Sequence, residues 1–191
     1  MSRLFMLLAV LVLAAAPALA IAAEPTVKLE PTQGTELSKE DDAAVRKALE
    51  DYLEALRKKE YQKAGELIER QSLLSTVEPL VHSIAADTTH TEAARRRIFG
   101  VATQDSVAAT GNGPLFESLM HYLFEINPNA AKVLERSTIQ VLATRQMKGK
   151  ASVAYQLTVA AEEPGGMPYE QVTAQQLKKV DGKWRILFRL E

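Results

Sequence analysis

Residues 169–190 have the sequence YEQVTAQQLKKVDGKWRILFRL, and this stretch decides the fold class. Its first twelve residues follow the pattern of a long polar strand, and Asp181-Gly182 is a strong signal for a two-residue hairpin turn. After the turn apolar residues alternate with basic ones, which places Trp184, Ile186 and Phe188 on one face. Alternation with period two on both sides of a tight turn predicts two antiparallel strands at the end of the chain.

The preceding residues extend this pattern toward the N-terminus. Residues 138–147 form one predicted strand, and Lys148-Gly149-Lys150 follows as a hairpin turn. In residues 151–161, apolar side chains such as Val153 and Tyr155 alternate with polar ones. Together with the terminal hairpin, these segments predict an antiparallel meander.

The first half of the domain has the period of helices instead. Ser38 with Asp41 three residues later resembles a capping box, and apolar residues then recur every three or four positions through Leu56. A second, shorter helix is expected over 61–70. Helices followed by an antiparallel meander predict an α+β fold with N-terminal helices packed on a curved sheet.

The middle segment, residues 71–135, is expected to add further helices. Pro79 is expected at the first position of one helix, and residues 89–99 form another behind a capping box. Residues 110–114 resemble a turn, and residues 115–126 are apolar almost all round, which predicts a buried helix. The fold therefore carries an enlarged helical middle segment.

Residues 1–23 are typical of a secretory signal peptide. Arg3 precedes an apolar run, and small residues offer cleavage near Ala20 to Ala23. Residues 24–37 contain two prolines and a glycine without any period, which indicates a flexible tether before a single domain at 38–191. We therefore expect a periplasmic or secreted protein without a stable membrane span after cleavage, although an uncleaved anchor is the competing interpretation.

Composition excludes several classes of protein. The 191 residues include 23 Lys+Arg and 24 Asp+Glu, and this near balance argues against a nucleic-acid partner. The chain has no cysteine, so disulfides, thiolate metal sites and a cysteine nucleophile are excluded. His82, His90 and His121 lack the spacing of a metal site, and no cofactor motif is present, so neither a metal nor a cofactor is expected.

A family resemblance rests on two parts of the chain. The long first helix is followed by a second that begins at Tyr61-Gln-Lys-Ala, and the chain ends in the hairpin around Val180-Asp-Gly-Lys-Trp184. Over 38–70 and 138–191 the chain resembles the nuclear transport factor two-like superfamily, which includes ketosteroid isomerase, scytalone dehydratase and polyketide cyclases. This resemblance implies a cystatin-like cone with a pocket between helices and sheet. Residues 71–135 depart from the family pattern, so an inherited activity does not follow.

The predicted strand interiors contain no aspartate and no histidine, and their polar residues are neutral amides and hydroxyls. Such groups orient a ligand but are poor acids and bases at neutral pH. His121 is a weak candidate for a catalytic base because it lies on the buried-looking helix. The six candidate pocket residues are Tyr52, His121, Tyr122, Tyr155, Gln175 and Trp184.

Three functions remain open. The first is a non-catalytic module that binds a small or lipid-like apolar ligand in the cone. The second is an interaction or assembly domain, for example a homodimer through the sheet. The third is a small isomerase, dehydratase or hydrolase in which His121 acts with Tyr155 or Glu170. The glutamines of the third strand also fit a simpler interpretation, a sheet that faces solvent.

Overall fold

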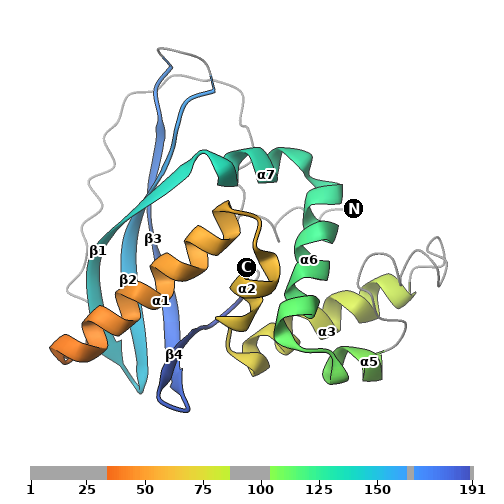
Figure 1. Ribbon diagram of the computed structural model, residues 1–191, viewed down its shortest axis with the longest axis horizontal. Coiled ribbons are helices and arrows are strands. Elements are labelled where there is room, and N and C mark those ends of the chain that lie inside the picture. Colours follow the sequence, from red (N-terminus) through yellow and green to blue (C-terminus); the bar gives the residue numbers. More distant parts are fainter. Residues whose placement is uncertain (1–33, 87–103, 163–165, 190–191) are drawn as a thin grey trace.

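The computed structural model describes residues 34–86, 104–162 and 166–189. The helices are α1 (Lys39–Arg57), α2 (Tyr61–Glu66), α3 (Arg70–Ala86), α5 (Gln104–Ala109), α6 (Asn112–Ile126) and α7 (Pro128–Glu135). The strands are β1 (Ser137–Met147), β2 (Lys150–Val159), β3 (Tyr169–Val180) and β4 (Lys183–Ile186). The strands form one antiparallel sheet in the order β1-β2-β3-β4, and α1 crosses one of its faces (Figure 1). The α+β prediction is therefore confirmed.

Three predictions lie outside the described residues. They are the signal peptide at 1–23, the tether over its part at 24–33, and the helix at 89–99 with His90. Near the end of the predicted tether, Thr35 is bridged to Gln146 of β1 through two backbone hydrogen bonds of 3.1 and 2.9 Å.

Both predicted hairpin turns are confirmed. The β1–β2 turn consists of Lys148 and Gly149, with φ angles of 48° and 76°, and the β3–β4 turn of Asp181 and Gly182, with 49° and 76°. Two successive positive φ angles define the type I′ turn, whose twist matches that of antiparallel strands. These turns set the register of the sheet.

Helix α1 begins where the sequence predicts. The Ser38 hydroxyl accepts a hydrogen bond of 3.1 Å from the backbone N–H of Asp41. The Asp41 carboxylate, instead of closing a capping box, accepts bonds of 2.9 Å from Trp184 Nε1 and 2.7 Å from Lys179 Nζ. One turn of helix is thereby fixed to the β3–β4 hairpin.

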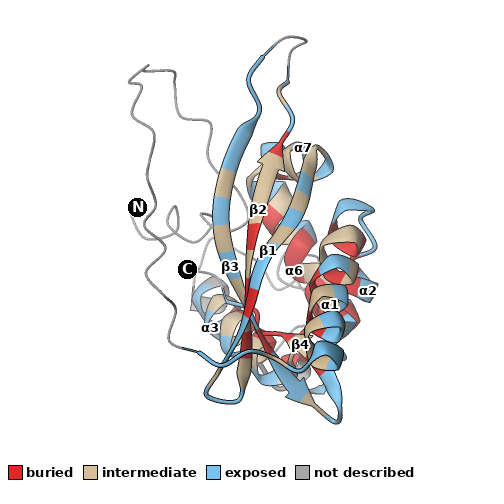
Figure 2. Cartoon of the chain, turned by 90° about the vertical axis from the view of Figure 1, so that its left-hand side faces the viewer, coloured by how far each residue is buried: buried red, intermediate tan, exposed pale blue. Residues whose placement is uncertain are grey.

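The sheet has an inner face toward the helices and an outer face. Cross-strand pairs place Val141, Tyr155 and Thr173 in one inner row, and Gln140, Gln156 and Val172 in the adjacent outer row. Figure 2 shows buried residues on the central strand β2 and on α6, while β3 alternates between exposed and intermediate positions. The sheet is therefore packed on one face, as the period-two pattern predicts.

The second predicted helix is shorter than expected. Helix α2 ends at Glu66, because after the C-cap residue Leu67 the chain turns and Ile68 forms a parallel bridge with Ile186 of β4. The N–H of Glu69 donates to the carbonyl of Ile186 at 2.8 Å, and the N–H of Ile186 donates to the carbonyl of Leu67 at 2.9 Å. Residues 67–69 therefore cover the free edge of β4 before α3 begins.

The middle segment is helical in most of its described residues, but its boundaries differ from the prediction. Pro79 lies inside α3 and does not begin a helix. The predicted turn at 110–114 contains the start of α6, whose first residue is Asn112. Helix α6 is not buried all round, since His121 and Ile126 are exposed.

Two glycines allow α2 and α6 to pack at very short range. A Cβ atom on Gly65 would lie 2.6 Å from the carbonyl oxygen of Asn112 and 2.7 Å from the Cβ of Phe116. One on Gly113 would lie 3.0 Å from the carbonyl oxygen of Gln62. This contact places Phe116, which is fully buried, in the centre of the core. In the described part of the chain, no helix is both long and apolar enough to cross a membrane.

Candidate functional site

A cavity of about 510 Å³ lies between α1, α7 and the inner face of the sheet, and we call it the sheet–helix cavity. Its walls come from α1, α7, β1, β2, β3 and the segment after β4. The apolar lining consists of Leu53, Leu56, Val133, Leu134, Ile139, Leu157 and Phe188. Its volume falls within the range of about 300–1,000 Å³ typical of pockets for small organic ligands.

Two tyrosines bring hydroxyl groups into this apolar lining. Tyr52 of α1 is 4% exposed and Tyr155 of β2 is 8% exposed, and both line the cavity. Burial raises the pKa of Tyr52 far above its usual value, and the neighbouring Tyr155 phenol raises it further. Burial likewise raises the pKa of Tyr155. Both phenols are therefore neutral at physiological pH and keep their O–H protons.

Neither tyrosine hydroxyl has a hydrogen-bond partner within residues 34–86, 104–162 and 166–189. The Tyr52 ring packs against the Phe116 ring in a tilted arrangement, with 6.2 Å between the two ring centroids. Buried hydroxyl groups without a partner are uncommon, because desolvation costs about 1–3 kcal/mol when no hydrogen bond compensates. The cavity is thus lined by two donors that residues 34–86, 104–162 and 166–189 do not satisfy.

Gln175 of β3 also lines the cavity, and its amide is partly used. Its Nε2 donates to the carbonyl of Leu187 at 2.8 Å and to the carbonyl of Gln176 at 3.1 Å. These bonds hold the segment after β4, from which Phe188 closes one wall of the cavity. Phe188 is itself fixed, because its N–H donates to Ser72 Oγ at 3.0 Å and its ring packs edge-on against Phe116 at 5.3 Å.

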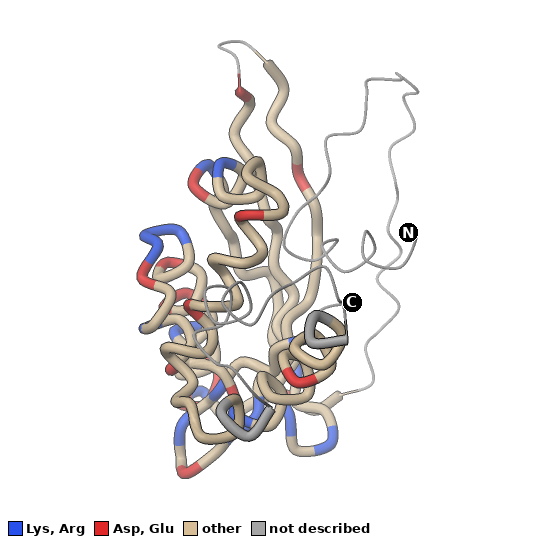
Figure 3. The backbone as a smooth tube through the Cα atoms, turned by 90° about the vertical axis from the view of Figure 1, so that its right-hand side faces the viewer, with Lys and Arg blue, Asp and Glu red and all other residues tan. Residues whose placement is uncertain are grey.

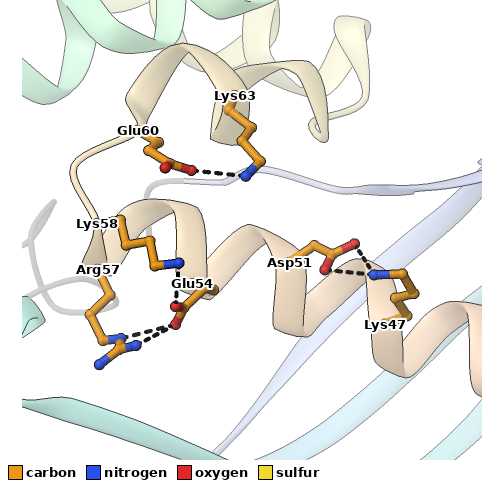
Figure 4. A network of polar contacts seen from close by, with 7 residues as sticks. All are labelled: Lys47, Asp51, Glu54, Arg57, Lys58, Glu60 and Lys63. Carbon is orange, nitrogen blue, oxygen red and sulfur yellow. Dashed lines mark hydrogen bonds and ion pairs between the residues drawn. The ribbon is translucent and has the colours of Figure 1, made fainter.

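Charged residues of α1 line the rim of the cavity and pair with one another (Figure 4). Arg57 donates to Glu54 at 2.7 Å, Lys58 lies 3.1 Å from the same carboxylate, and Lys47 pairs with Asp51 at 2.8 Å. Arg57 and Lys58 hold the pKa of Glu54 below its usual value, so this carboxylate is ionised at neutral pH. Asp51, Glu54 and Arg57 of these pairs belong to the cavity lining, which also contains Glu50 and Arg189.

The structure brings three of the six predicted pocket residues together, namely Tyr52, Tyr155 and Gln175. Trp184 lies elsewhere. It is 7% exposed, and its indole N–H donates a hydrogen bond to Asp41. Lys179 Nζ lies over its ring, 5.7 Å from the ring centroid. Trp184 therefore connects the hairpin to α1 and does not line the cavity.

His121 and Tyr122 on α6 also lie outside the cavity lining. His121 is exposed, and its ring contacts Tyr61 edge-on at 5.8 Å. Glu170, which was a candidate to act together with His121, is exposed on the outer face of β3 opposite Thr158. The structure does not bring His121, Tyr155 and Glu170 together as acid and base.

Sequence reasoning missed the wall contributed by α7. No helix is predicted after the one over 115–126, whereas Pro128 occupies the first turn of α7. A proline at that position is a known signal for a helix start, and it could have revealed α7. Val133 and Leu134 of this helix then line the cavity. Lys59, which follows α1, pairs with Glu135 of α7 at 2.6 Å and joins the two walls.

The acidic and basic residues that line the cavity come from α1 and from the segment after β4; they are Glu50, Asp51, Glu54, Arg57 and Arg189. Figure 3 shows that charged residues concentrate on helices and turns, while the strands carry few. Among the residues described, no group of three histidine, aspartate or glutamate side chains is arranged to hold a metal ion. Two other hollows, of about 660 and 770 Å³, are lined chiefly by charged, amide and hydroxyl side chains. The sheet–helix cavity is the better candidate site because its lining is mainly apolar.

Comparison with protein families, with curated proteins and with solved structures finds no match to this chain. The function is therefore argued from the geometry of the sheet–helix cavity.

Proposed function

We propose that this protein is a non-catalytic binding module that holds a small, mainly apolar ligand in the sheet–helix cavity. The observation that carries the proposal is a cavity of about 510 Å³ with apolar walls from α1, α7 and the sheet. An apolar molecule that leaves water for such a cavity gains roughly 25 cal/mol for each Å² of surface buried. The buried tyrosines of the lining, Tyr52 and Tyr155, are neutral phenols, and this favours binding over catalysis.

The family resemblance supports this proposal at the level of the fold. We propose that the chain is a nuclear transport factor two-like cone with an enlarged helical segment, in which the sheet–helix cavity is the interior of the cone. The helix-then-meander order and the β3–β4 hairpin agree with this assignment.

The leader supports a periplasmic or secreted location. The expected product of cleavage near Ala20 to Ala23 is a domain tethered by residues 24–37. Expression of the full chain in a bacterial host, followed by intact mass measurement of the periplasmic fraction, tests this. A protein of full length retained in the membrane fraction would contradict the proposed location.

The binding proposal is tested with a neutral apolar dye, N-phenyl-1-naphthylamine, whose fluorescence rises in apolar surroundings. We expect the secreted protein to bind one dye molecule. Ile139→Trp places a large side chain in the cavity and should abolish binding, because Ile139 lines it. Gln140→Trp is the matched control, since the next residue of β1 is exposed on the outer face and should leave binding intact.

Two results would contradict the binding proposal. One is the absence of dye binding by wild-type protein, and the other is equal binding by Ile139→Trp and Gln140→Trp. Circular dichroism checks that Ile139→Trp is folded, and Leu157→Phe provides a smaller obstruction of the same cavity if it is not. Native mass spectrometry of the periplasmic protein should also detect a co-purified small molecule.

A second candidate function, assembly of two copies through the outer sheet face, is favoured by the pattern of charges there. Leu142 and Val172 are exposed by 43% and 45%. Toward one end of this face lies Glu170, and toward the other lie Arg145 and Lys178, the latter 3.8 Å from the Glu69 carboxylate. A two-fold axis near the centre of the face would place Glu170 of each copy beside the basic end of the other.

This candidate predicts a dimer at micromolar concentration in sedimentation experiments. Val172→Glu would add two like charges near the axis and should give a monomer, whereas Val172→Thr should preserve the dimer. A wild-type monomer at all accessible concentrations would remove this candidate. Ligand binding in the sheet–helix cavity does not depend on it.

A further inference from the structure

A second hollow, of about 660 Å³, lies between α3 and the end of the sheet next to the β1–β2 turn, and we call it the α3–sheet hollow. Three cationic residues line it, namely Lys150 of β2, Lys178 of β3 and Arg189 of the segment after β4. Glu69, just before α3, is the acidic residue of its described lining. The lining therefore carries an excess of two positive charges.

The two lysines of the hollow are placed where they repel each other. Lys150 and Lys178 are directly opposite on neighbouring strands, and Lys178 is in turn opposite Arg185 of β4. Like charges in directly opposite positions destabilise a sheet. Arg185 donates a hydrogen bond to the carbonyl of Glu66 and lines a different hollow. An anion bound between Lys150 and Lys178 would replace their repulsion with two attractions.

The protein compensates these charges only in part within residues 34–86, 104–162 and 166–189. Lys178 Nζ lies 3.8 Å from Glu69 Oε1, which is longer than a hydrogen bond, and Lys150 and Arg189 have no partner there. The other carboxylate oxygen of Glu69 accepts a bond of 2.6 Å from the N–H of Ser72 in the first turn of α3. One carboxylate shared with the helix does not balance three cations.

The uncharged polar groups of the lining are mostly acceptors. Ser72, Ser75 and Thr76 of α3 each donate their hydroxyl proton to a backbone carbonyl three or four residues earlier. Ser72 Oγ also accepts the N–H of Phe188, so the oxygens of Ser75 and Thr76 are left to accept from hydroxyl groups of a ligand. Gln71 is exposed and adds an amide. The anion-binding donors of strongest charge are therefore the two lysines and Arg189.

We propose that the α3–sheet hollow binds a phosphate monoester, whose phosphoryl oxygens accept hydrogen bonds from Lys150, Lys178 and Arg189. Near neutral pH such a group carries a charge of about −1.5 to −2, which matches the excess charge of the lining. A carboxylate carries one charge and would leave one cation uncompensated. This site is additional to the proposed ligand site in the sheet–helix cavity, although Arg189 lines both.

The test measures the binding of glycerol 3-phosphate to the secreted protein by isothermal titration calorimetry, with acetate and glycerol as probes of lower charge. The variants are Lys150→Gln, Lys178→Gln and the double variant. Lys148→Gln is the matched control, because Lys148 lies in the β1–β2 turn and outside the lining. It removes the same charge two residues away from Lys150.

Wild-type protein should bind glycerol 3-phosphate more tightly than acetate, and glycerol should show no binding. Each single lysine substitution in the hollow should weaken glycerol 3-phosphate binding about threefold, and the double variant should weaken it about tenfold, as expected for partly exposed ion pairs. Lys148→Gln should bind as wild type does. Without any anion, Lys150→Gln should unfold at a slightly higher urea concentration than wild type, because a repulsion is removed.

The source of the phosphate monoester is identified with vesicles of equimolar phosphatidylcholine and phosphatidic acid, compared with vesicles of phosphatidylcholine alone. Sedimentation of the protein with the first kind only, lost in the double variant and kept in Lys148→Gln, identifies a lipid headgroup. Binding of glycerol 3-phosphate without sedimentation identifies a free phosphate monoester.

Three results would overturn the proposal. The first is that neither glycerol 3-phosphate nor the vesicles with phosphatidic acid bind wild-type protein. The second is an equal loss of binding in Lys148→Gln and Lys150→Gln, which would show attraction by overall charge and no defined site. The third is loss of glycerol 3-phosphate binding in Ile139→Trp, which would place the phosphate in the sheet–helix cavity. Failure of dye binding in that cavity leaves the phosphate site unaffected.

Discussion

The interior is packed to very different densities in two regions. One is the contact between α2 and α6, and the other is the space between α1 and the sheet. At the first, Gly65 and Gly113 let two backbones approach so closely that a single added carbon would meet protein atoms at 3.0 Å or less. At the second, long apolar side chains surround a cavity of about 510 Å³. Close packing is the rule in protein interiors, so the unfilled region is the exception that calls for a functional explanation.

The largest effect is expected from a substitution that breaks the filled region. Gly65→Val would force α2 away from the carbonyl of Asn112 and from Phe116, neither of which can rotate out of the way. We expect the free energy of unfolding to fall by about 4 kcal/mol or more, above the range of about 1–3 kcal/mol usual for overpacking, because the atoms in the way belong to or adjoin the backbone. Urea denaturation followed by circular dichroism measures it.

Gly111→Ala is the control for this substitution. Gly111 precedes α6 and an added Cβ there would meet only the Cδ of Pro114, at 3.8 Å. A loss well below 1 kcal/mol is expected. Equal losses for Gly65→Val and Gly111→Ala would show that the α2–α6 contact is not the constraint that we describe.

A matched pair on α1 compares the two regions directly. Leu49 is fully buried in the core, while Leu53, one turn later, is half-buried and lines the sheet–helix cavity. Leu49→Ala leaves a new void and should cost about 3 kcal/mol, whereas Leu53→Ala enlarges an existing space and should cost about 1 kcal/mol. Urea denaturation of both variants measures the difference, and a larger loss for Leu53→Ala would contradict it.

The prediction from sequence succeeded where structure depends on neighbouring residues. Gly149 and Gly182 follow residues that tolerate positive φ, so both turns are encoded within two positions. The apolar period of α1 likewise predicts which side of it, including Tyr52, faces the sheet. In both cases the required information lies within one element.

Prediction failed where the partner is distant in the sequence. The second predicted helix stops early because residues 67–69 bond to Ile186, which lies more than a hundred residues later. On α6 almost every residue is apolar, so periodicity could not indicate that His121 faces outward. The cavity could not be predicted for the first of these reasons. Its walls at α7 and at Phe188 are distant from α1 in the sequence and reach it only in the complete fold.

Two carboxylates near the start of α1 predict that the stability of the fold depends on pH. Near its start, hydrogen bonds from Lys179 and then Trp184 hold the pKa of Asp41 below its usual value of 3.8, and Thr144 followed by Arg46 lower that of Asp42. A carboxylate whose pKa is lower in the folded state stabilises the fold above its unfolded pKa. That contribution is lost as the pH falls through the folded pKa.

We therefore expect the urea midpoint of the wild type to decrease as the pH is lowered from about 4. Asp41→Asn should have a lower midpoint than wild type at pH 7 and a smaller decrease in acid, so that the two curves converge. Parallel curves for the two proteins would mean that the bonds from Lys179 and Trp184 to Asp41 do not favour its ionised form.

The smallest effect, and the one that most sharpens the comparison, is expected for Tyr52→Phe without ligand. Removing a buried hydroxyl usually costs about 1 kcal/mol because a hydrogen bond is lost, and Ser72→Ala should show this, since Ser72 Oγ bonds both Glu69 and Phe188. The Tyr52 hydroxyl has no such bond within the described residues, so Tyr52→Phe should leave the free energy of unfolding unchanged or raise it by up to about 1 kcal/mol. Thermal and urea unfolding of both variants after delipidation measure this difference. A loss for Tyr52→Phe as large as that for Ser72→Ala would mean that the Tyr52 hydroxyl already has a hydrogen-bond partner in the empty protein.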